Sequence, residues 1–145
     1  MNQPDAQNAK KLLRTQLSAA RQTLAKDAAA PGGLETQLLS LVAHIGAKTV
    51  AAYLPFGTEP NTIQFVVGAA GHGLKLIMPV SNLDGTLHWV EYTGKSAPGI
   101  FGFEEPVGPE AKLPDADLIL IPASAVDLRG NRLGKGKGFY DVALA

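Results

Sequence analysis

Residues 129–138 combine glycines and cations at a spacing that suits anion binding. They read Arg-Gly-Asn-Arg-Leu-Gly-Lys-Gly-Lys-Gly, so four cations stand within nine residues, and the nearest acids are Asp127 and Asp141. Glycine lets successive backbone N–H groups converge on one anion, while the interleaved lysines add compact positive charge. This pattern predicts a polyphosphate site. The alternative that it leaves open is a flexible, solvated basic loop.

Two features at the end of this stretch would strengthen such a site. A helix that begins near Phe139 would point the positive end of its dipole toward the same anion. Asp141 could hold Mg²⁺ beside the phosphates, because magnesium takes carboxylate and phosphate oxygens together. The spacing of glycine and lysine does not match a Walker A loop, so the prediction rests on the local chemistry.

A basic stripe follows from the helical period of residues 5–30. Lys10, Arg14 and Arg21 fall within about 40° of one another at roughly 100° per residue. The stripe borders the apolar face of Leu13, Leu17 and Leu24, so the cations could lie over a cleft while the helix packs. The alternative is that these long side chains cover the edge of a core and extend their charges into water.

Glu59 stands in a loop, residues 55–60, that is bounded by two prolines and follows a predicted strand. A carboxylate at this place could accept paired hydrogen bonds from the N–H edge of a ring such as a pterin. The competing interpretation is an ordinary glutamate in a surface turn, which is the more frequent explanation for an isolated acid of this kind.

The elements that must position these residues alternate between helix and strand. Apolar periodicity predicts helices over residues 5–30, 34–45 and 61–70, and strands over 49–54, 74–80, 87–92 and 117–121. The last strand, a run of Leu and Ile, suits the middle of a parallel sheet covered on both faces. We therefore predict an α/β fold with an open, mainly parallel sheet flanked by helices, whose ligands bind at the carboxyl ends of the strands.

Residues 93–116 are rich in Gly and Pro and have no sustained period, which makes them a candidate binding loop. Among nearby aromatic residues, Trp89, Tyr92, Phe101 and Phe103 could stack on a ligand, although core packing is the expected use of at least half of them.

Composition bounds the class of protein. The 145 residues suit one domain, residues 1–145, and 46% of them are hydrophobic, as in globular proteins. Thirteen basic and thirteen acidic residues cancel, so no global field favours nucleic acid or membranes. The absence of Cys fits a reducing compartment, and no apolar run is long enough to span a bilayer. We expect a cytoplasmic protein, a monomer, with no nucleic-acid or membrane partner.

Four segments together resemble the 5-formyltetrahydrofolate cyclo-ligases, a family also called methenyltetrahydrofolate synthetases. They are residues 10–14 (KKLLR), 53–62 (YLPFGTEPNT), 102–106 (GFEEP) and 117–141, which contains DLRGNRLGKGKGFYD. Their order and spacing match the family throughout. The last segment is highly specific, whereas each of the others would be unconvincing by itself.

The resemblance implies a set of site residues. ATP would be bound by Lys10, Arg14, Arg132, Gly134, Lys135, Gly136, Lys137, Gly138, Phe139 and Tyr140, with Asp141 as a ligand of Mg²⁺. The folate, 5-formyltetrahydrofolate, would contact Leu54, Glu59, Lys135, Gly136, Lys137, Gly138 and Phe139.

The implied reaction is ATP-dependent closure of a one-carbon bridge. Phosphoryl transfer to the formyl oxygen, attack by the second folate nitrogen and loss of phosphate would give 5,10-methenyltetrahydrofolate, ADP and phosphate. Such a transfer depends mostly on alignment and charge neutralisation, so Lys135 and Lys137 are the expected catalytic residues and no side-chain nucleophile is needed.

Two departures from the family pattern define the alternatives. Phe139 stands where the family usually has Tyr, and the chain ends four residues after Asp141, so we expect the C-terminal elements of the family fold to be missing. The main alternative is therefore a non-catalytic nucleotide-binding module derived from this fold. A third interpretation, in which residues 129–137 contact RNA, is disfavoured by the neutral net charge.

Overall fold

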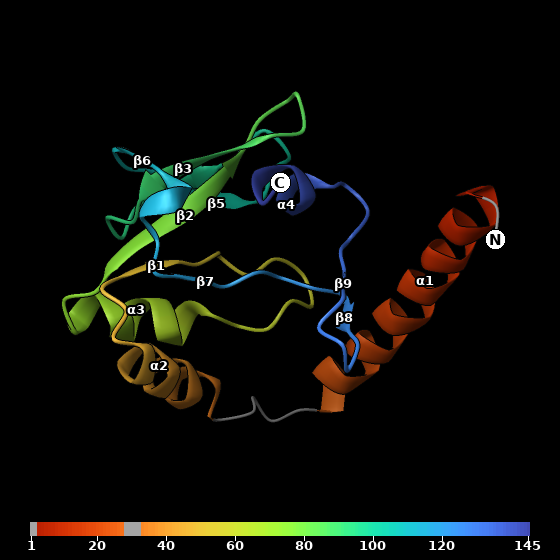
Figure 1. The fold of residues 1–145 in the computed structure, drawn as a ribbon, viewed down its shortest axis with the longest axis horizontal. Helices are drawn as coiled ribbons and strands as arrows, with labels where there is room; N and C mark the ends of the chain where they lie inside the picture. The colour runs from red at the N-terminus through yellow and green to blue at the C-terminus, as the bar shows by residue number, and fades with distance from the viewer. Residues whose placement is uncertain (1–2, 28–32) are drawn as a thin grey trace.

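A five-stranded sheet forms the centre of the computed structural model, which describes residues 3–27 and 33–145 (Figure 1). In spatial order its strands are β6 (Glu110–Ala111), β3 (Leu87–Glu91), β2 (Lys75–Ser81), β1 (Thr49–Ala51) and β7 (Leu118–Ile119). β1 is parallel to β2 and β7, while β3 is antiparallel to both β2 and β6, so only β3 runs against the others. The predicted α/β class with an open, mainly parallel sheet is confirmed.

Helices cover both faces of this sheet. On one face lie α2 (Leu34–Ile45) and α3 (Ile63–Gly71), and on the other lies the short helix α4 (Phe139–Ala143) (Figure 1). Side chains alternate along a strand, so neighbouring residues serve different faces. Val50 packs in the cluster that contains Phe65 of α3, whereas Ala51 packs in the cluster that Tyr140 of α4 joins.

The loop after β1 is shaped by the end of strand pairing. The predicted strand over residues 49–54 pairs only through Ala51, after which Ala52 donates one further hydrogen bond to Ile77. The following residues leave the sheet and Thr62 closes the loop, because its hydroxyl donates to the carbonyl of Tyr53 over 2.6 Å. The loop thus stands at the carboxyl end of β1.

The prediction for residues 117–121 needs a correction. Their strand, β7, is the edge strand of the sheet and is half-buried, not a fully buried central strand. Leu118 and Ile119 do pack against opposite faces of the sheet. The apolar run therefore predicts correctly that both faces of the strand are covered, but it does not predict whether the strand lies at the centre or the edge of the sheet.

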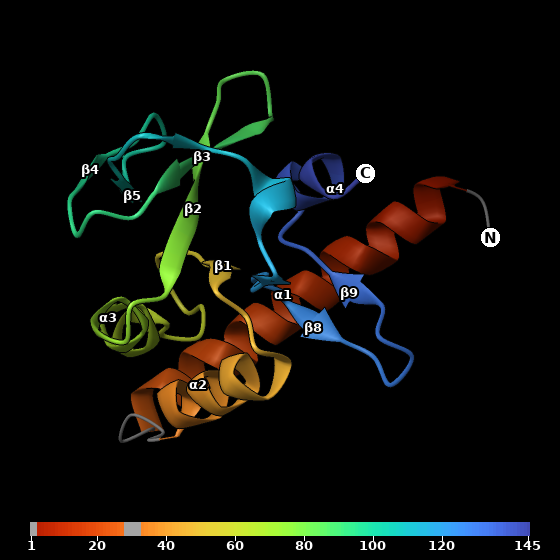
Figure 2. The same cartoon turned by 60° about the vertical axis from the view of Figure 1, so that its left-hand side comes forward.

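Residues 93–116, predicted as a candidate binding loop because they lack a sustained period, are more regular than a simple loop. They contain β4 (Ser96–Pro98), β5 (Glu104–Pro106), β6 and a 3₁₀ turn, η1 (Leu113–Asp115). β4 and β5 pair antiparallel as a separate ribbon beside the sheet (Figure 2). Strands of two or three residues that include proline are too short to give a detectable alternation.

A further hairpin, which the sequence patterns did not predict, contains the first part of the basic stretch of residues 129–138. β8 (Ala125–Val126) pairs with β9 (Arg132–Leu133), and Asp127 holds the turn between them. The Asp127 carboxylate accepts hydrogen bonds from the backbone of Arg129 and from the backbone and side chain of Asn131. These bonds, led by the one from the Asn131 side chain, lower the pKa of Asp127 below 3.8.

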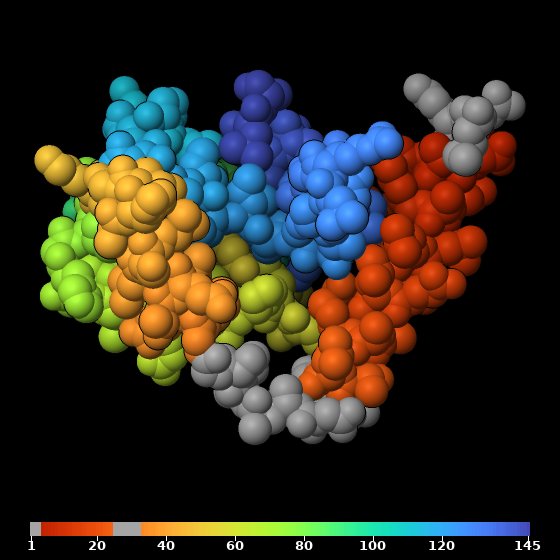
Figure 3. Space-filling view, turned by 60° about the horizontal axis from the view of Figure 1, so that its bottom comes forward, coloured from red at the N-terminus to blue at the C-terminus, as the bar shows by residue number. Residues whose placement is uncertain are grey.

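The first helix, α1 (Gln3–Asp27), runs along the β8–β9 hairpin (Figures 2 and 3). The end predicted at residue 30 lies outside the described residues. The helix does not turn its leucine face inward as predicted, because Leu13 is 44% and Leu24 is 66% exposed. Arg14 and Arg21 face the body of the protein instead and hydrogen-bond to Gly134 and Ser124. Polar contacts, more than apolar packing, orient this helix.

None of the helices in the described residues combines the length and the apolar content that crossing a membrane requires.

Asp117 supplies a testable contribution to stability. Its carboxylate accepts the backbone N–H groups of Thr49 and Lys48 at the start of β1, and these bonds lower its pKa below 3.8. A lowered pKa stabilises the fold above the unfolded pKa, and this contribution is lost as the pH falls through the folded value. We expect Asp117→Asn to be less stable than the parent at pH 7 and closer to it at an acidic pH below the lowered pKa of Asp117. Urea unfolding at both pH values measures this.

Asp115→Asn is the control, since its carboxylate accepts no hydrogen bond within the described part of the chain. An equal loss of stability at both pH values for Asp117→Asn would contradict the assignment.

Candidate functional site

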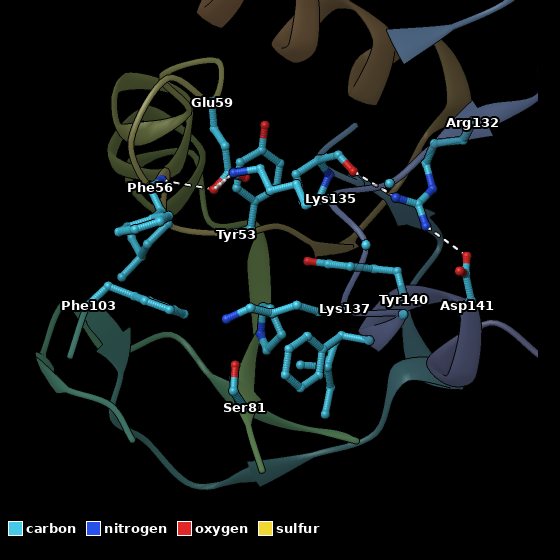
Figure 4. Close-up of a pocket in the computed structure, with 18 of the residues that line it drawn as sticks. Tyr53, Phe56, Glu59, Ser81, Phe103, Arg132, Lys135, Lys137, Tyr140 and Asp141 are labelled. Atoms are coloured by element: carbon cyan, nitrogen blue, oxygen red, sulfur yellow. Dashed lines mark hydrogen bonds and ion pairs between the residues drawn. The ribbon is translucent and has the colours of Figure 1, made fainter. Parts of the chain in front are cut away.

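One pocket of about 360 Å³ lies at the carboxyl ends of the parallel strands β1, β2 and β7. Its walls come from α1, the loop after β1, the β5 region and the chain from β9 into α4 (Figure 4). All of the predicted site residues line it: Lys10, Arg14, Leu54, Glu59, Arg132, Gly134, Lys135, Gly136, Lys137, Gly138, Phe139, Tyr140 and Asp141. The structure brings them together, while their individual roles stay predictions.

The basic glycine loop, residues 134–138, is shaped by two residues with a left-handed backbone. Gly136 has a φ of 101° and Gly138 a φ of 73°, a region that residues with a side chain rarely adopt. Between them, Lys137 extends into the pocket, where its amino group lies 4.4 Å from the ring centre of Phe101 (Figure 4). α4 begins at Phe139 as predicted.

Glu59 is buried and already paired, so it is not the surface glutamate of the competing interpretation. Its side chain is only 10% exposed, and the amino group of Lys135 lies 3.0 Å from Oε1. The same oxygen accepts the backbone N–H of Phe56 over 3.1 Å. A carboxylate held in this way is oriented before any ligand arrives.

Four phenylalanines form a row beside these charged groups. Phe56 and Phe103 have ring centres 4.8 Å apart, Phe101 and Phe103 are 6.3 Å apart, and Phe101 and Phe139 are 5.9 Å apart. Phe56 and Phe101 are 52% and 42% exposed, so this row is not core. Trp89, in contrast, is buried in the core, as expected for part of the aromatic set.

Two tyrosines on the pocket wall, Tyr53 and Tyr140, have raised pKa values. Burial, with a smaller effect of the Glu59 charge, raises the pKa of Tyr53 to about 12. The pKa of Tyr140 is raised as well, again mainly by burial. Both phenols are therefore neutral hydrogen-bond donors near pH 7. Tyr53 was not among the predicted site residues, although the second resemblance segment begins with it.

Asp141 lies at the open side of the pocket. The side chain of Asp141 is 79% exposed, and its Oδ1 lies 3.0 Å from Nη2 of Arg132 in an ion pair. Arg132 also donates a hydrogen bond to the carbonyl of Pro122. No group of three potential metal ligands occurs within residues 3–27 and 33–145. Mg²⁺ does not require one, because it commonly keeps several waters and takes one or two carboxylates plus phosphate oxygens. Asp141 fits that donor set.

Glu105 is a second buried acid on the wall, and sequence reasoning did not select it. Its Oε2 accepts the backbone N–H of Ser81 at the end of β2 over 2.7 Å. Its Oε1 has no hydrogen-bond partner in the described residues. The carboxylate fits against Gly99, where a Cβ atom would overlap it. The bond between Glu105 and Ser81 joins the β4–β5 ribbon to β2 of the sheet.

Gly99→Ala should therefore displace the Glu105 carboxylate. Because overpacking a filled site typically costs about 1–3 kcal/mol, we expect a loss of that size in the free energy of unfolding, measured with urea. Gly71→Ala is a matched control, since nothing lies within 4 Å of its added Cβ. Unchanged stability of Gly99→Ala would show that the carboxylate relocates freely.

The fold and the pocket define an α/β protein with a basic glycine loop at the carboxyl edge of its sheet. Residues 6–145 match the model of the 5-formyltetrahydrofolate cyclo-ligase family. The chain belongs to this family.

Named relatives agree with this assignment. The chain is 38% identical over 109 residues to the 5-formyltetrahydrofolate cyclo-ligase of Mycolicibacterium smegmatis, covering 69% of the chain and 56% of that relative. It is 30% identical over 115 residues to the enzyme of the same name from Haemophilus influenzae, covering 73% of the chain and 60% of that relative. The match thus spans somewhat more than half the length of these relatives.

Two solved structures share the fold. The NMR structure of the 5,10-methenyltetrahydrofolate synthetase of Aquifex aeolicus superposes with a TM-score of 0.74 and 28% identity, over 93% of this chain and 71% of that one. The corresponding protein of Mycoplasma pneumoniae gives a TM-score of 0.61 and 21% identity, over 93% and 76%. The second comparison shows the fold alone.

Proposed function

We propose that this protein converts 5-formyltetrahydrofolate to 5,10-methenyltetrahydrofolate in an ATP-dependent reaction that releases ADP and phosphate. The observation that supports this most is a single pocket that unites a preoriented buried carboxylate, Glu59, with the cations of the basic glycine loop. Membership of the cyclo-ligase family supports the same reaction. The proposal includes the expectation of a monomer that acts in the cytoplasm.

In this proposal the nucleotide phosphates occupy the basic side of the pocket. Arg14 and Arg132 line this side together with Lys135 and Lys137, while Lys10 stands at its edge on α1. The loop glycines, Gly134, Gly136 and Gly138, permit close approach of the backbone to an anion. Phe139 and Tyr140 continue the same wall.

The folate would enter between Glu59 and the phenylalanine row. Glu59 would accept two hydrogen bonds from the N–H edge of the pterin ring, while Leu54 and Phe139 offer apolar contact. The flat ring would pack against Phe56 and Phe103, which both line the pocket. Residues 135–138 would then separate the folate from the nucleotide and contact both.

The chemistry requires aligned reactants and neutralised charge. The formyl oxygen attacks the terminal phosphorus and ADP leaves; the second folate nitrogen then attacks the formyl carbon, and the bond to the phosphorylated oxygen breaks. Lys135 and Lys137 would stabilise the negative charge on the transferring group. Mg²⁺, where bound, would neutralise phosphate oxygens beside Asp141. Neutral Tyr53 and Tyr140 would donate hydrogen bonds without competing for the cations.

A spectroscopic assay tests the proposal. The 145-residue chain is mixed with 5-formyltetrahydrofolate and MgATP, and the absorbance of methenyl-folate is followed, with a reaction lacking ATP as the control. ATP-dependent turnover is the expected result. Binding of ATP without turnover by the folded 145-residue chain would contradict the proposal and favour the non-catalytic nucleotide-binding module.

A further inference from the structure

A second cavity, of about 320 Å³, lies beside the main pocket, where α1 faces the loop after β1. Its lining residues are mostly polar: Arg14, Ser18, Arg21, Gln22, Phe56, Gly57, Thr58, Ser124 and Lys135. Three of them are charged, and all three are cations. Arg14, Phe56 and Lys135 also line the main pocket, so the two cavities are adjacent.

Hydrogen bonds to two loops hold the Arg21 side chain in this cavity. Its Nε donates to the hydroxyl of Thr58 over 3.3 Å, and its Nη1 donates to the carbonyl of Ser124 over 3.1 Å. These partners belong to the loop after β1 and to the segment before β8, so the guanidinium joins three parts of the chain. A side chain that merely extended its charge into water would not make these bonds.

The charge of Arg21 is not neutralised within the described residues. The side chain is half-buried, and both of its hydrogen-bond acceptors are uncharged. Arg14 is similar, because its Nε donates only to the carbonyl of Gly134 over 2.8 Å. Taking a cation partly out of water is unfavourable unless an anion compensates it. A guanidinium has five N–H donors, so both arginines keep several for a ligand.

We infer that this second cavity is an oxyanion subsite, in which Arg21 and Arg14 bind a phosphate or carboxylate group. A planar guanidinium can grip either group with two parallel hydrogen bonds. Ser18, Gln22 and Thr58 add neutral donors to the wall. The inference of the subsite depends only on the hydrogen bonds of Arg14 and Arg21 and on the lining of the cavity. The identity of its natural ligand rests on the proposed function, which offers the phosphates of ATP and the glutamyl carboxylates of a folate.

Inorganic phosphate is the probe for the subsite itself. Titration calorimetry of the parent chain and of Arg21→Gln should show phosphate binding that weakens about tenfold or more in the variant. Lys112→Gln removes an exposed charge that lines neither cavity and is the matched control. Gln22→Glu is a second variant, which keeps the arginine and the side-chain size but adds a competing carboxylate, and it should weaken phosphate binding as well.

The natural ligand is identified by two further titrations of the same variants. Selective weakening of ATP binding assigns the subsite to a nucleotide phosphate, whereas selective weakening for a folate with several glutamates over one with a single glutamate assigns it to the tail. Unchanged binding of phosphate, ATP and both folates in folded Arg21→Gln and Gln22→Glu would overturn the inference.

These readouts separate the inference from the proposed function. Arg21-dependent phosphate binding in a chain without turnover would leave the subsite standing and remove the reaction. Turnover together with anion binding that does not change in Arg21→Gln would support the reaction and contradict the subsite.

Discussion

Replacing Lys135 and Lys137 together with alanine is expected to abolish turnover and to weaken ATP binding strongly. Both amino groups line the proposed phosphate side of the pocket, and removing one preorganised charge contact of this kind typically lowers kcat by about 10²–10³. The double change should therefore leave no measurable turnover and weaken ATP binding at least about 100-fold. Titration of ATP and the methenyl-folate assay measure the two effects.

The single variants should separate binding from stability. Lys135 pairs with buried Glu59, so its removal leaves a carboxylate without its cation and should lower the free energy of unfolding. Lys137 has no carboxylate partner in the described residues and lies over the ring of Phe101, so its removal should impair activity while stability changes little. Lys112→Gln is the control for both. Full ATP binding by the folded double variant would rule out the basic loop as the phosphate site.

Glu59→Gln is expected to affect the affinities for the two proposed ligands of the pocket differently. The buried carboxylate would accept hydrogen bonds from the folate ring, and hydrogen bonds to a charged group are worth about 1.5–3 kcal/mol. We therefore expect folate binding to weaken by about 10–100-fold. ATP binding should be unchanged or tighter, because the amide no longer holds the Lys135 amino group by charge. Equilibrium titrations of each ligand alone test both signs.

Glu110→Gln, an exposed change on β6, is the control for Glu59→Gln. An equal loss of affinity for folate and ATP would show that Glu59 acts only through the shape of the loop.

The residues of the pocket were predictable because their chemistry is local. Glycine and lysine alternate over residues 134–138, and that pattern needs no knowledge of the fold to indicate an anion site. Glu59 was ambiguous from sequence, since burial decides its meaning and burial depends on Lys135, which is distant in the chain. The order of the longer helices and of strands β1, β2, β3 and β7 was predictable for the same local reason, through apolar periodicity.

What failed were the features set by partners far away in sequence. Glu105 finds its partner in Ser81, 24 residues earlier, and no pattern around residue 105 signals this bond. The edge position of β7 depends on which strands are its neighbours, and the orientation of α1 depends on hydrogen bonds across more than 100 residues. The short β4–β5 ribbon has too few residues for any period to be visible.

The attachment of α1 gives the molecule a further property. Arg14 and Arg21 make hydrogen bonds across 120 and 103 residues of sequence, while no leucine of the helix is fully buried. The contacts that dock this helix and the cations proposed to receive a ligand are thus the same side chains. Segments held by few buried apolar contacts open locally at low free energy, and a ligand that binds only the closed form raises that free energy. Helix docking and ligand affinity are therefore coupled. A substitution that weakens the docking of α1 should lower ligand affinity at the pocket even where the substituted residue contacts no ligand.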